Sequence, residues 1–216
     1  STQTYKHLNS GEGGLITSDN AEFMARSIIL SGSYMFYERH GAAPEAEVFS
    51  DIRLDTPNYS GRMDNLRAAI LRPQLNSLEA NIKRWNKRYQ IVEQKLQKVK
   101  GVVLPERPDK EHYVGSSIQF RIPGISHTKA TKFIEANKQL GVEIKWFGSD
   151  EPTGFTSNHK SWHYVKRQKL ENSDKILSGL FDLRLPLTFS LDDCSLLSDI
   201  ICECVQEHIP DTSKVN

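Results

Sequence analysis

The chain has 216 residues, with 28 Lys and Arg against 27 Asp and Glu, which gives a formal net charge of +1 at pH 7. Such a balance provides no bulk attraction to nucleic acid or an anionic membrane, so we expect neither as a partner. No stretch approaches the ~18–20 apolar residues that cross a bilayer, and the polar N-terminus lacks a signal peptide's apolar segment. The three cysteines, Cys194, Cys202 and Cys204, lie close together in the sequence. An odd number of cysteines without a secretory signal predicts free thiols in a reducing cytoplasm.

The first element in chain order is a lysine followed by a glycine-rich turn. Lys6 precedes Gly11–Gly14 and the apolar pair Leu15-Ile16. This order predicts a lysine on a loop at the mouth of a sheet, with a strand over 15–17 and backbone able to approach a ligand closely. A lysine amine becomes a nucleophile when its pKa is lowered, as in Schiff-base chemistry with pyridoxal phosphate. A solvated surface lysine beside an ordinary hairpin turn is the alternative interpretation, and a single motif does not exclude it.

The next elements are helices separated by an irregular segment. Ser18-Asp19 is a candidate N-cap for a helix over 21–30, whose apolar residues recur at helical spacing. The apolar residues of 33–57 show neither helical nor strand spacing, so this segment is expected to be a long loop. A loop of that length is either functional or simply mobile. A helix capped by Asp64 is then predicted to run to Gly101, with a kink or division at Pro73.

The remainder predicts a small α/β layer. Strands are expected over 113–122, 142–146 and 183–187. Helices are expected over 129–140, capped by Ser126 or Thr128, over 171–179, and over 191–207, capped by Ser190. Asp192-Asp193 is interpreted as a charge pair that favours the start of the last helix. Mixed strands and helices of this kind pack as a compact layer.

Two histidines raise the question of a metal site. His159 and His163 stand four residues apart, as on a metal-binding helix face. Zinc needs at least three protein ligands, no third is evident nearby, and neighbouring lysine and arginine side chains would repel a cation. We therefore predict no metal site, and interpret these histidines as contacts to an anionic substrate or to solvent.

Two motifs resemble one enzyme family. Ser-x-Gln-x-x-Lys-x-Leu-x-x-Gly-Glu-Gly-Gly at 1–14 and Tyr-x-x-Arg-Met-Asp-x-Leu-x-Ala-Ala-Ile-x-x-x-Gln-Leu at 59–75 closely resemble segments of the DegT/StrS sugar aminotransferases. The resemblance implies an α/β chain with the fold-type-I, aspartate-aminotransferase-like architecture and pyridoxal 5'-phosphate as cofactor. It also implies that the chain is the C-terminal part of a larger enzyme, with 1–100 ending the large domain and 101–216 forming the small one.

The resemblance also assigns roles to residues. Lys6 would carry the cofactor and act in catalysis, and Ser1 would contact the cofactor phosphate, with Gln3 beside it. The substrate would be a nucleotide-linked keto sugar and the amino donor an amino acid such as glutamate, in cell-surface polysaccharide or amino-sugar biosynthesis. A homodimer with a composite site is implied, so Ser60 would face the cofactor phosphate of the neighbouring subunit. By position alone, the substrate candidates are Tyr34, Trp146, Phe155, His159 and Trp162.

The second motif departs from the family at one position, and three interpretations besides transamination stay open. The family usually has asparagine where this chain has Ser60, and a serine hydroxyl can still donate a hydrogen bond to a phosphate. A sister branch with histidine in place of the lysine dehydrates sugars, but here His7 stands beside Lys6 rather than replacing it. The second open interpretation is a noncatalytic binding or regulatory protein that keeps the fold. The third is a structural fragment without a ligand.

Overall fold

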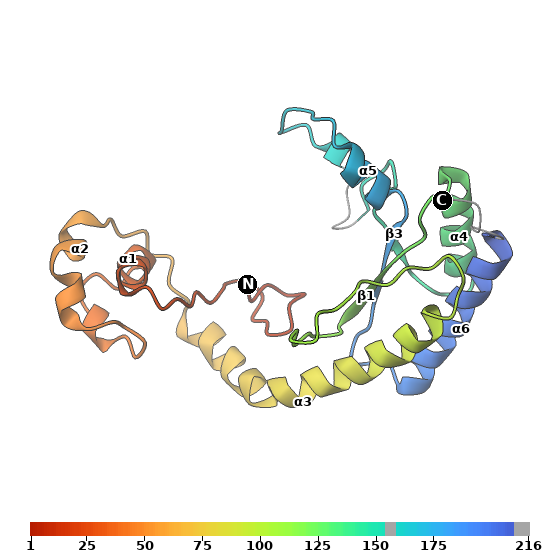
Figure 1. Ribbon diagram of the computed structural model, residues 1–216. Coiled ribbons are helices and arrows are strands. Elements are labelled where there is room, and N and C mark those ends of the chain that lie inside the picture. The colour runs from red at the N-terminus through yellow and green to blue at the C-terminus, as the bar shows by residue number, and fades with distance from the viewer. Residues whose placement is uncertain (154–158, 210–216) are drawn as a thin grey trace. The chain divides into compact units, whose positions relative to one another are not determined.

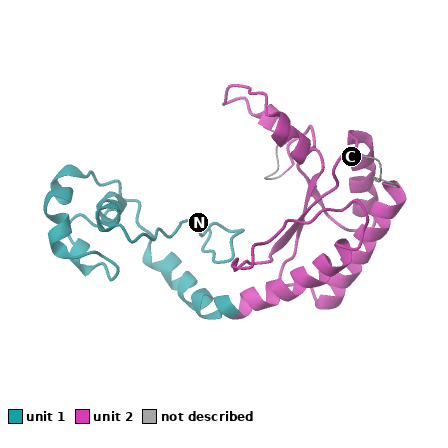
Figure 2. Cartoon of the chain, in the orientation of Figure 1, with its two compact units in different colours: residues 1–79 teal, residues 80–216 magenta. Residues whose placement is uncertain are grey.

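A computed structural model describes residues 1–153 and 159–209 (Figure 1). The chain forms two compact units, Ser1–Glu79 and a second that starts at Ala80 (Figure 2). Helix α3 (Asn65–Leu96) begins in the first unit and ends in the second. The structure is mixed α/β, with helices and one small antiparallel sheet.

The first unit is built around helix α1 (Ala21–Ser31). Its N-cap is Asn20, whose side chain accepts a 2.9 Å hydrogen bond from the backbone N–H of Phe23, so the cap lies one residue after the predicted Ser18-Asp19 pair. The helix ends at Gly32, where φ is 120° and the backbone N–H reaches the carbonyls of Ile28 and Ile29. The predicted helix over 21–30 is therefore confirmed.

The aperiodic segment 33–57 contains structure that its sequence pattern did not predict. Two 3-10 turns, η1 (Tyr37–Arg39) and η2 (Ala46–Val48), lead into helix α2 (Phe49–Asp55). The rings of Tyr37 and Phe49 stack at 4.3 Å, and both side chains are buried with residues of α1. Tertiary packing thus orders a segment that has no helical periodicity of its own.

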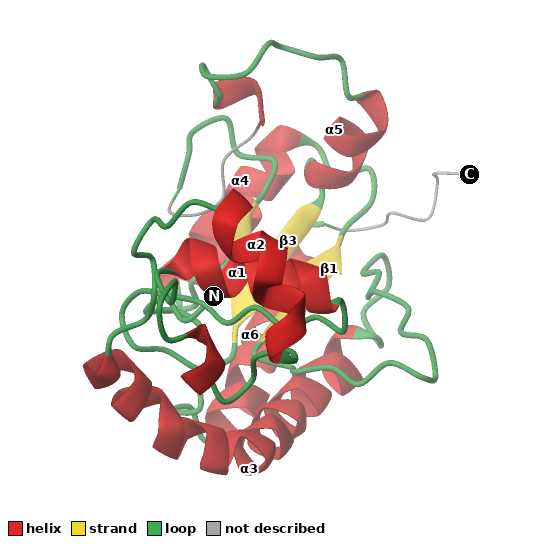
Figure 3. Cartoon of the chain, turned by 90° about the vertical axis from the view of Figure 1, so that its left-hand side faces the viewer, coloured by secondary structure: helices red, strands yellow, loops and turns green. Residues whose placement is uncertain are grey.

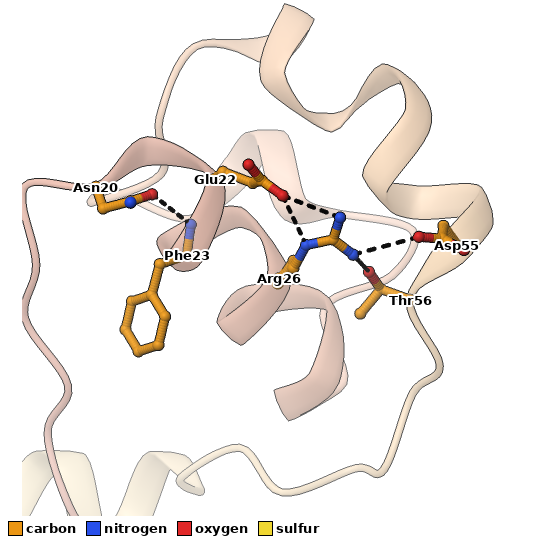
Figure 4. A network of polar contacts seen from close by, with 6 residues as sticks. All are labelled: Asn20, Glu22, Phe23, Arg26, Asp55 and Thr56. Carbon is orange, nitrogen blue, oxygen red and sulfur yellow. Dashed lines mark hydrogen bonds and ion pairs between the residues drawn. The ribbon is translucent and has the colours of Figure 1, made fainter.

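A polar network around Arg26 joins α1 to the C-terminal end of α2 (Figure 4). The guanidinium of Arg26 donates to Glu22 one turn earlier at 3.0 Å, to Thr56 at 3.2 Å and to Asp55 at 3.4 Å. Because these groups are largely exposed, we expect the network to orient α2 more than to stabilise the unit.

The strand predicted over Leu15-Ile16-Thr17 is absent, and that prediction was wrong. The described residues of the first unit contain no strand, and the side chains of Leu15 and Ile16 are 60% and 63% exposed. An extended segment becomes a strand only when another strand supplies its hydrogen-bond partners. The apolar run therefore lies in irregular chain outside any described strand of this unit.

Helix α3 begins as predicted, since the Asp64 carboxylate accepts a 2.9 Å hydrogen bond from the backbone N–H of Arg67. The helix continues through Pro73 as one element, so the proline does not divide it. It ends at Leu96, and turns carry the chain to Gly101, where φ is 87°.

The second unit contains a three-stranded antiparallel sheet in the order β1-β3-β2, formed by β1 (Ser117–Arg121), β2 (Lys145–Trp146) and β3 (Leu180–Arg184). Ile118 and Phe120 of β1 share one buried face with Phe181 and Leu183 of β3. Helices α4 (His127–Gln139) and α6 (Leu191–His208) pack against each other and contribute residues to the same core (Figure 3). The aromatic centre of this core consists of Phe120, Phe133, Trp146 and Phe181.

The last strand lies three residues earlier than the predicted 183–187. Gly179 follows helix α5 (Glu171–Leu177), and its carbonyl accepts a 2.9 Å hydrogen bond from Ile122 at the end of β1. A Cβ at Gly179 would lie 2.4 Å from the Ile122 carbonyl oxygen, so only glycine permits this approach. Pairing with β1 sets the register, which the apolar pattern over 183–187 did not reveal.

Helix caps in the second unit follow the sequence. Ser126 caps α4, and Ser190 forms a reciprocal capping box with Asp193 at the start of α6. The hydrogen bonds from Ser190 hold the pKa of Asp193 below its usual range. The interpretation of Asp193 as a group that favours this helix start is confirmed.

The three cysteines are free thiols, and burial raises the pKa of each. Cys194 and Cys204 belong to the core of the second unit, and Cys202 packs beside it. Raised pKa values and burial are typical of structural cysteines. Across the described residues, none of the helices combines the length and the apolar character that a membrane span requires.

Asp182 is a charged side chain that this fold buries. It lies on β3 between Gln119 of β1 and Lys145 of β2, and burial raises its pKa above the usual value despite hydrogen bonds from Ser117 and Gln119. A carboxyl with a raised folded-state pKa costs stability as pH rises through that pKa, because the unfolded chain ionises it at lower cost.

We expect Asp182→Asn to raise the free energy of unfolding at pH 7, with the gain shrinking as pH falls toward the ordinary pKa of a carboxyl. Urea unfolding at several pH values checks this result, with exposed Glu135→Gln on α4 as the control. A lower stability of the Asn variant at pH 7 would show that the carboxylate's hydrogen bonds outweigh its burial.

Candidate active site

The segment around Lys6 is a loop closed on itself by backbone hydrogen bonds. The Thr2 N–H donates to the Gly13 carbonyl at 2.8 Å, and the Thr4 N–H donates to the Gly11 carbonyl at 3.0 Å. The Ser10 N–H donates to the Thr2 carbonyl at 2.9 Å. The Thr2 side chain is buried inside this closure. We call residues 2–13 the lysine loop, because its closed base presents Lys6 in the connecting turn.

Gly13 is required at the base of the lysine loop. Its φ is 126°, and a Cβ there would lie 2.8 Å from Thr2 Oγ1 and 3.0 Å from Met63 Cε. A side chain at this position would therefore both strain the backbone and displace the buried threonine. The sequence analysis assigned this glycine to a turn and to close approach of a ligand, and the structure adds the contact with Thr2 as a reason for it.

Lys6 occupies a tight turn at the exposed end of the lysine loop. Its backbone N–H donates to the Gln3 carbonyl at 2.9 Å, and its own carbonyl accepts a 3.3 Å hydrogen bond from the Asn9 side chain. The residue is exposed, so its amine is accessible to a ligand. Local hydrogen bonds thus fix the backbone of Lys6, and the residue itself is exposed.

Ser1 and Gln3 lie on the same short segment as Lys6. Ser1 Oγ accepts a 3.3 Å hydrogen bond from the Gln3 N–H, and Gln3 Oε1 accepts a 3.0 Å hydrogen bond from the Tyr5 N–H. The Ser1 hydroxyl keeps its own hydrogen, which can donate to an anion. Gln3 uses its carbonyl oxygen to shape the turn, and its amide group carries two further donors.

Ser60 has a left-handed backbone, with a φ of 52°; among the described residues it is the single non-glycine with positive φ. Its N–H donates to Asn58 Oδ1 at 2.9 Å, and Arg62, two positions later, donates to the Gly32 carbonyl at 2.9 Å. Asparagine tolerates this backbone region better than serine. Arg62 therefore ties this segment to the end of α1, rather than forming the surface ion pair that an arginine beside a helix start usually makes.

We expect Ser60→Asn to stabilise the first unit by recovering part of the roughly 1–2 kcal/mol that a left-handed backbone costs an ordinary residue. Slower amide hydrogen exchange of buried Ile28 and Ile29 in α1 would measure the gain. Ser50→Asn, at an exposed helical position of α2, is the matched control and should give no gain. Equal exchange in Ser60→Asn and the unaltered chain would argue against backbone strain at Ser60.

The substrate candidates are divided between the units. Tyr34 lies in the first unit and is 53% exposed. His159 lies in the second unit, where Nε2 is 2.6 Å from Asp174 Oδ1, and this contact lowers the pKa of Asp174. Trp162 stacks on Tyr164 with ring centroids 6.0 Å apart, and both rings are partly exposed. Phe155 lies outside the described residues.

Two of these positions have structural partners that the sequence did not show. His159 links 3-10 turn η3 (His159–Ser161) to α5 through Asp174, which also pairs with Lys160 at 3.3 Å. Trp146 stacks near Phe181 and donates its ring N–H to the Ser178 carbonyl at 2.9 Å. Trp146 also lines a cavity of about 560 Å³ with Ser149 and Arg184, a volume typical of small-molecule sites.

The lysine loop has the chemistry to hold pyridoxal phosphate. The exposed Lys6 lies on this loop, and the Ser1 hydroxyl, five positions earlier, is joined to the loop by its hydrogen bond from the Gln3 N–H. An amine suits an aldehyde, and a hydroxyl donor suits a phosphate. Residues 1–153 and 159–209 contain no cluster of three or more His, Cys, Asp or Glu side chains that could bind a metal ion.

One contact to the lysine loop was missed by sequence reasoning. The Gln74 side chain on α3 accepts a 3.0 Å hydrogen bond from the Asn9 N–H and donates a 2.7 Å hydrogen bond to the Asn9 carbonyl. Gln74 belongs to the second motif, but a glutamine on a polar helix surface is indistinguishable in sequence from a solvated one. Its partner lies 65 positions away, and only folding brings the two together.

Comparison with known proteins identifies a family for this chain. A model of the DegT/DnrJ/EryC1/StrS aminotransferase family matches residues 1–202. None of the curated proteins matches the chain.

Solved structures share the fold at low sequence identity. The aminotransferase TlmJ from Streptoalloteichus hindustanus is 15% identical over 95% of this chain and 51% of its own, with a TM-score of 0.71. A PLP-dependent aminotransferase from Bacillus cereus ATCC 10987 is 18% identical over 93% of this chain and 50% of its own, with a TM-score of 0.68. DesI, solved in the presence of its TDP-sugar product, is 18% identical over 94% of this chain and 48% of its own, with a TM-score of 0.67.

The chain spans about half the length of these solved structures. Their shared architecture is that of fold-type-I PLP-dependent aminotransferases, so the predicted fold class is confirmed. The family match covers both motifs, including Lys6 and the segment around Ser60. The chain therefore belongs to the DegT/DnrJ/EryC1/StrS aminotransferase family.

Proposed function

We propose that this chain is the lysine-bearing part of a PLP-dependent aminotransferase that transfers an amino group from an amino acid, such as glutamate, to a nucleotide-linked keto sugar. We place the reaction in amino-sugar or cell-surface polysaccharide biosynthesis. We assign residues 1–100 to the end of the large domain and 101–216 to the small one. The observation that carries the proposal is the exposed Lys6 on the hydrogen-bonded lysine loop, with Ser1 directly before that loop.

The family match supports the class of reaction, and the DesI structure with a TDP-sugar product supports the class of substrate. Lysine at position 6 favours transamination over the sister dehydration reaction, in which a histidine replaces it. The nucleotide, the sugar and the carbon that receives nitrogen depend on substrate-binding loops, and Tyr34, His159 and Trp162 are our candidates there.

When bound, pyridoxal phosphate supplies an aldehyde for an amine and a pyridine ring that accepts electrons from a carbon being deprotonated. Lys6 Nζ would hold the cofactor through its aldehyde. As a free amine, Lys6 Nζ would serve as the base that accepts and returns a proton, first for the amino donor and then, in the reverse direction, for the keto sugar.

Ser1 and Ser60 are assigned to phosphate binding. The Ser1 hydroxyl would donate to the phosphate of the cofactor held by Lys6, and Gln3 orients the segment through its hydrogen bond with the Tyr5 N–H. Ser60 would donate to the cofactor phosphate of the neighbouring subunit in a homodimer with composite sites. Ser60 is exposed and lies outside the helices and strands, which is compatible with a contact to a partner subunit.

The test is a spectrum with pyridoxal phosphate before and after borohydride, followed by mass mapping of the modified residue. Because the chain spans half the length of its solved relatives, the protein is expressed at the family's full length, with the 216-residue chain alone for comparison. We expect a reducible adduct at Lys6 in the full-length protein and no turnover by the chain alone. A folded full-length protein without that adduct would favour a noncatalytic binding role.

A further inference from the structure

Two hydrogen bonds join the lysine loop to helix α3. The family resemblance assigns no role to the two residues that make them. Gln74 Oε1 accepts from the Asn9 N–H at 3.0 Å, and Gln74 Nε2 donates to the Asn9 carbonyl at 2.7 Å. One side-chain amide thus binds both backbone groups of one loop residue. This arrangement fixes the orientation of that residue as well as its position.

The Gln74 side chain is itself held in place. Its Nε2 donates a second hydrogen bond, of 3.0 Å, to the Ile70 carbonyl one turn earlier on α3. Both amide hydrogens of Gln74 are therefore engaged, one to the helix and one to the loop. The side chain is partly buried and lies directly after Pro73, whose ring restricts the backbone at this turn.

Asn9 continues the connection toward Lys6. Its side-chain Nδ2 donates to the Lys6 carbonyl at 3.3 Å, while its backbone is held by Gln74. The Ser10 N–H, next in sequence, donates to Thr2 at the base of the loop. A path of hydrogen bonds therefore runs from α3 through Gln74 and Asn9 to the residue that carries the reactive amine.

We propose that Gln74 is a positioning residue for Lys6: it anchors Asn9, and through Asn9 the turn that presents the lysine amine. The inference rests on the proposed function, because it matters for chemistry only if Lys6 bonds the cofactor. Gln74 lies on α3 and acts through Asn9, so it is not itself a catalytic residue. Displacement of a reacting group by as little as 1 Å costs about a hundredfold in rate, so a loosened loop should be slow to react.

Three variants separate the parts of this contact. Gln74→Ala removes all three hydrogen bonds, and Gln74→Asn is one methylene too short to make them. Gln74→Glu keeps the acceptor for the Asn9 N–H but, when ionised, places a carboxylate against the Asn9 and Ile70 carbonyls. Exposed Gln90→Ala, on the same helix in the second unit, is the matched control.

The first readout needs no cofactor. We expect the Asn9 amide hydrogen to exchange about tenfold faster in Gln74→Ala than in the unaltered protein, since it loses its acceptor. Exchange of the α1 amides should stay unchanged and shows that the unit remains folded. If Gln74→Ala fails to fold, the same comparison is made with Gln74→Asn, whose shorter side chain also takes the acceptor away from the Asn9 N–H.

The second readout is the rate of borohydride-trapped pyridoxal phosphate attachment at Lys6 in the full-length protein. We expect it to be about tenfold slower in Gln74→Ala and Gln74→Glu, and unchanged in Gln90→Ala. Equal rates in all variants, with attachment at Lys6 intact, would overturn the positioning role alone. Absence of attachment in the unaltered protein would overturn the proposed function and this inference together.

Discussion

Lys6→Ala is expected to eliminate the reducible cofactor adduct and to reduce aminotransferase activity of the full-length protein on the order of 10⁴-fold or more, as removal of a covalent catalytic group does. The physical reason is that no other group on the lysine loop combines a primary amine with an exposed position. The variant should fold normally, because the described hydrogen bonds of Lys6 use its backbone. Mass mapping after borohydride reduction, together with steady-state kinetics, measures both effects.

Two companion variants sharpen this result. Lys6→Arg keeps the positive charge but cannot form the same bond to an aldehyde, so it should behave as Lys6→Ala does. Lys87→Ala, an exposed lysine on α3, should leave attachment and activity unchanged. Normal turnover by Lys6→Ala would refute the assignment and would return Lys6 to the status of a solvated surface cation.

Phe181→Ala is expected to lower the free energy of unfolding of the second unit by about 3–5 kcal/mol. Phe181 is fully buried in β3. Its ring lies 5.4 Å from that of Phe120, 5.2 Å from that of Phe133 and 6.4 Å from that of Trp146. Truncation removes the residue shared by these ring contacts, at the position where β3 pairs with both neighbouring strands.

Urea unfolding followed by tryptophan fluorescence measures this loss, because Trp146 reports on the same core. Phe181→Leu should cost less, since it fills part of the space that the ring leaves. Leu196→Ala, at a 60% exposed position on α6, is the control and should change stability by less than about 0.5 kcal/mol. A similar small change in Phe181→Ala would mean that the aromatic cluster does not hold the unit together.

Local chemistry made parts of the structure predictable. Asp64, Ser126 and Ser190 each begin a helix, because a short polar side chain can accept a hydrogen bond from a free N–H of the first turn. Helical apolar spacing located α1, α4 and α6 to within a few residues. These signals depend only on residues within a few positions of one another.

Non-local pairing decided the elements that were predicted wrongly. Leu15-Ile16-Thr17 has strand composition, but a strand needs another strand to pair with its backbone. The register of β3 follows from the contact of Gly179 with Ile122, and an apolar run alone does not define a register. Helix α2 forms in an aperiodic segment because Phe49 packs on Tyr37.

The sequence by itself determined the family and its candidate lysine, because Lys6, Ser1 and the glycine turn lie within fourteen consecutive residues. The tertiary structure decided how that lysine is held. Gln74 reaches Asn9 across 65 positions, and His159 pairs with Asp174 across 15. In both contacts, polar groups that are distant in the sequence become hydrogen-bond partners only because the folded backbone brings them together. Local sequence patterns do not reveal which distant groups will meet.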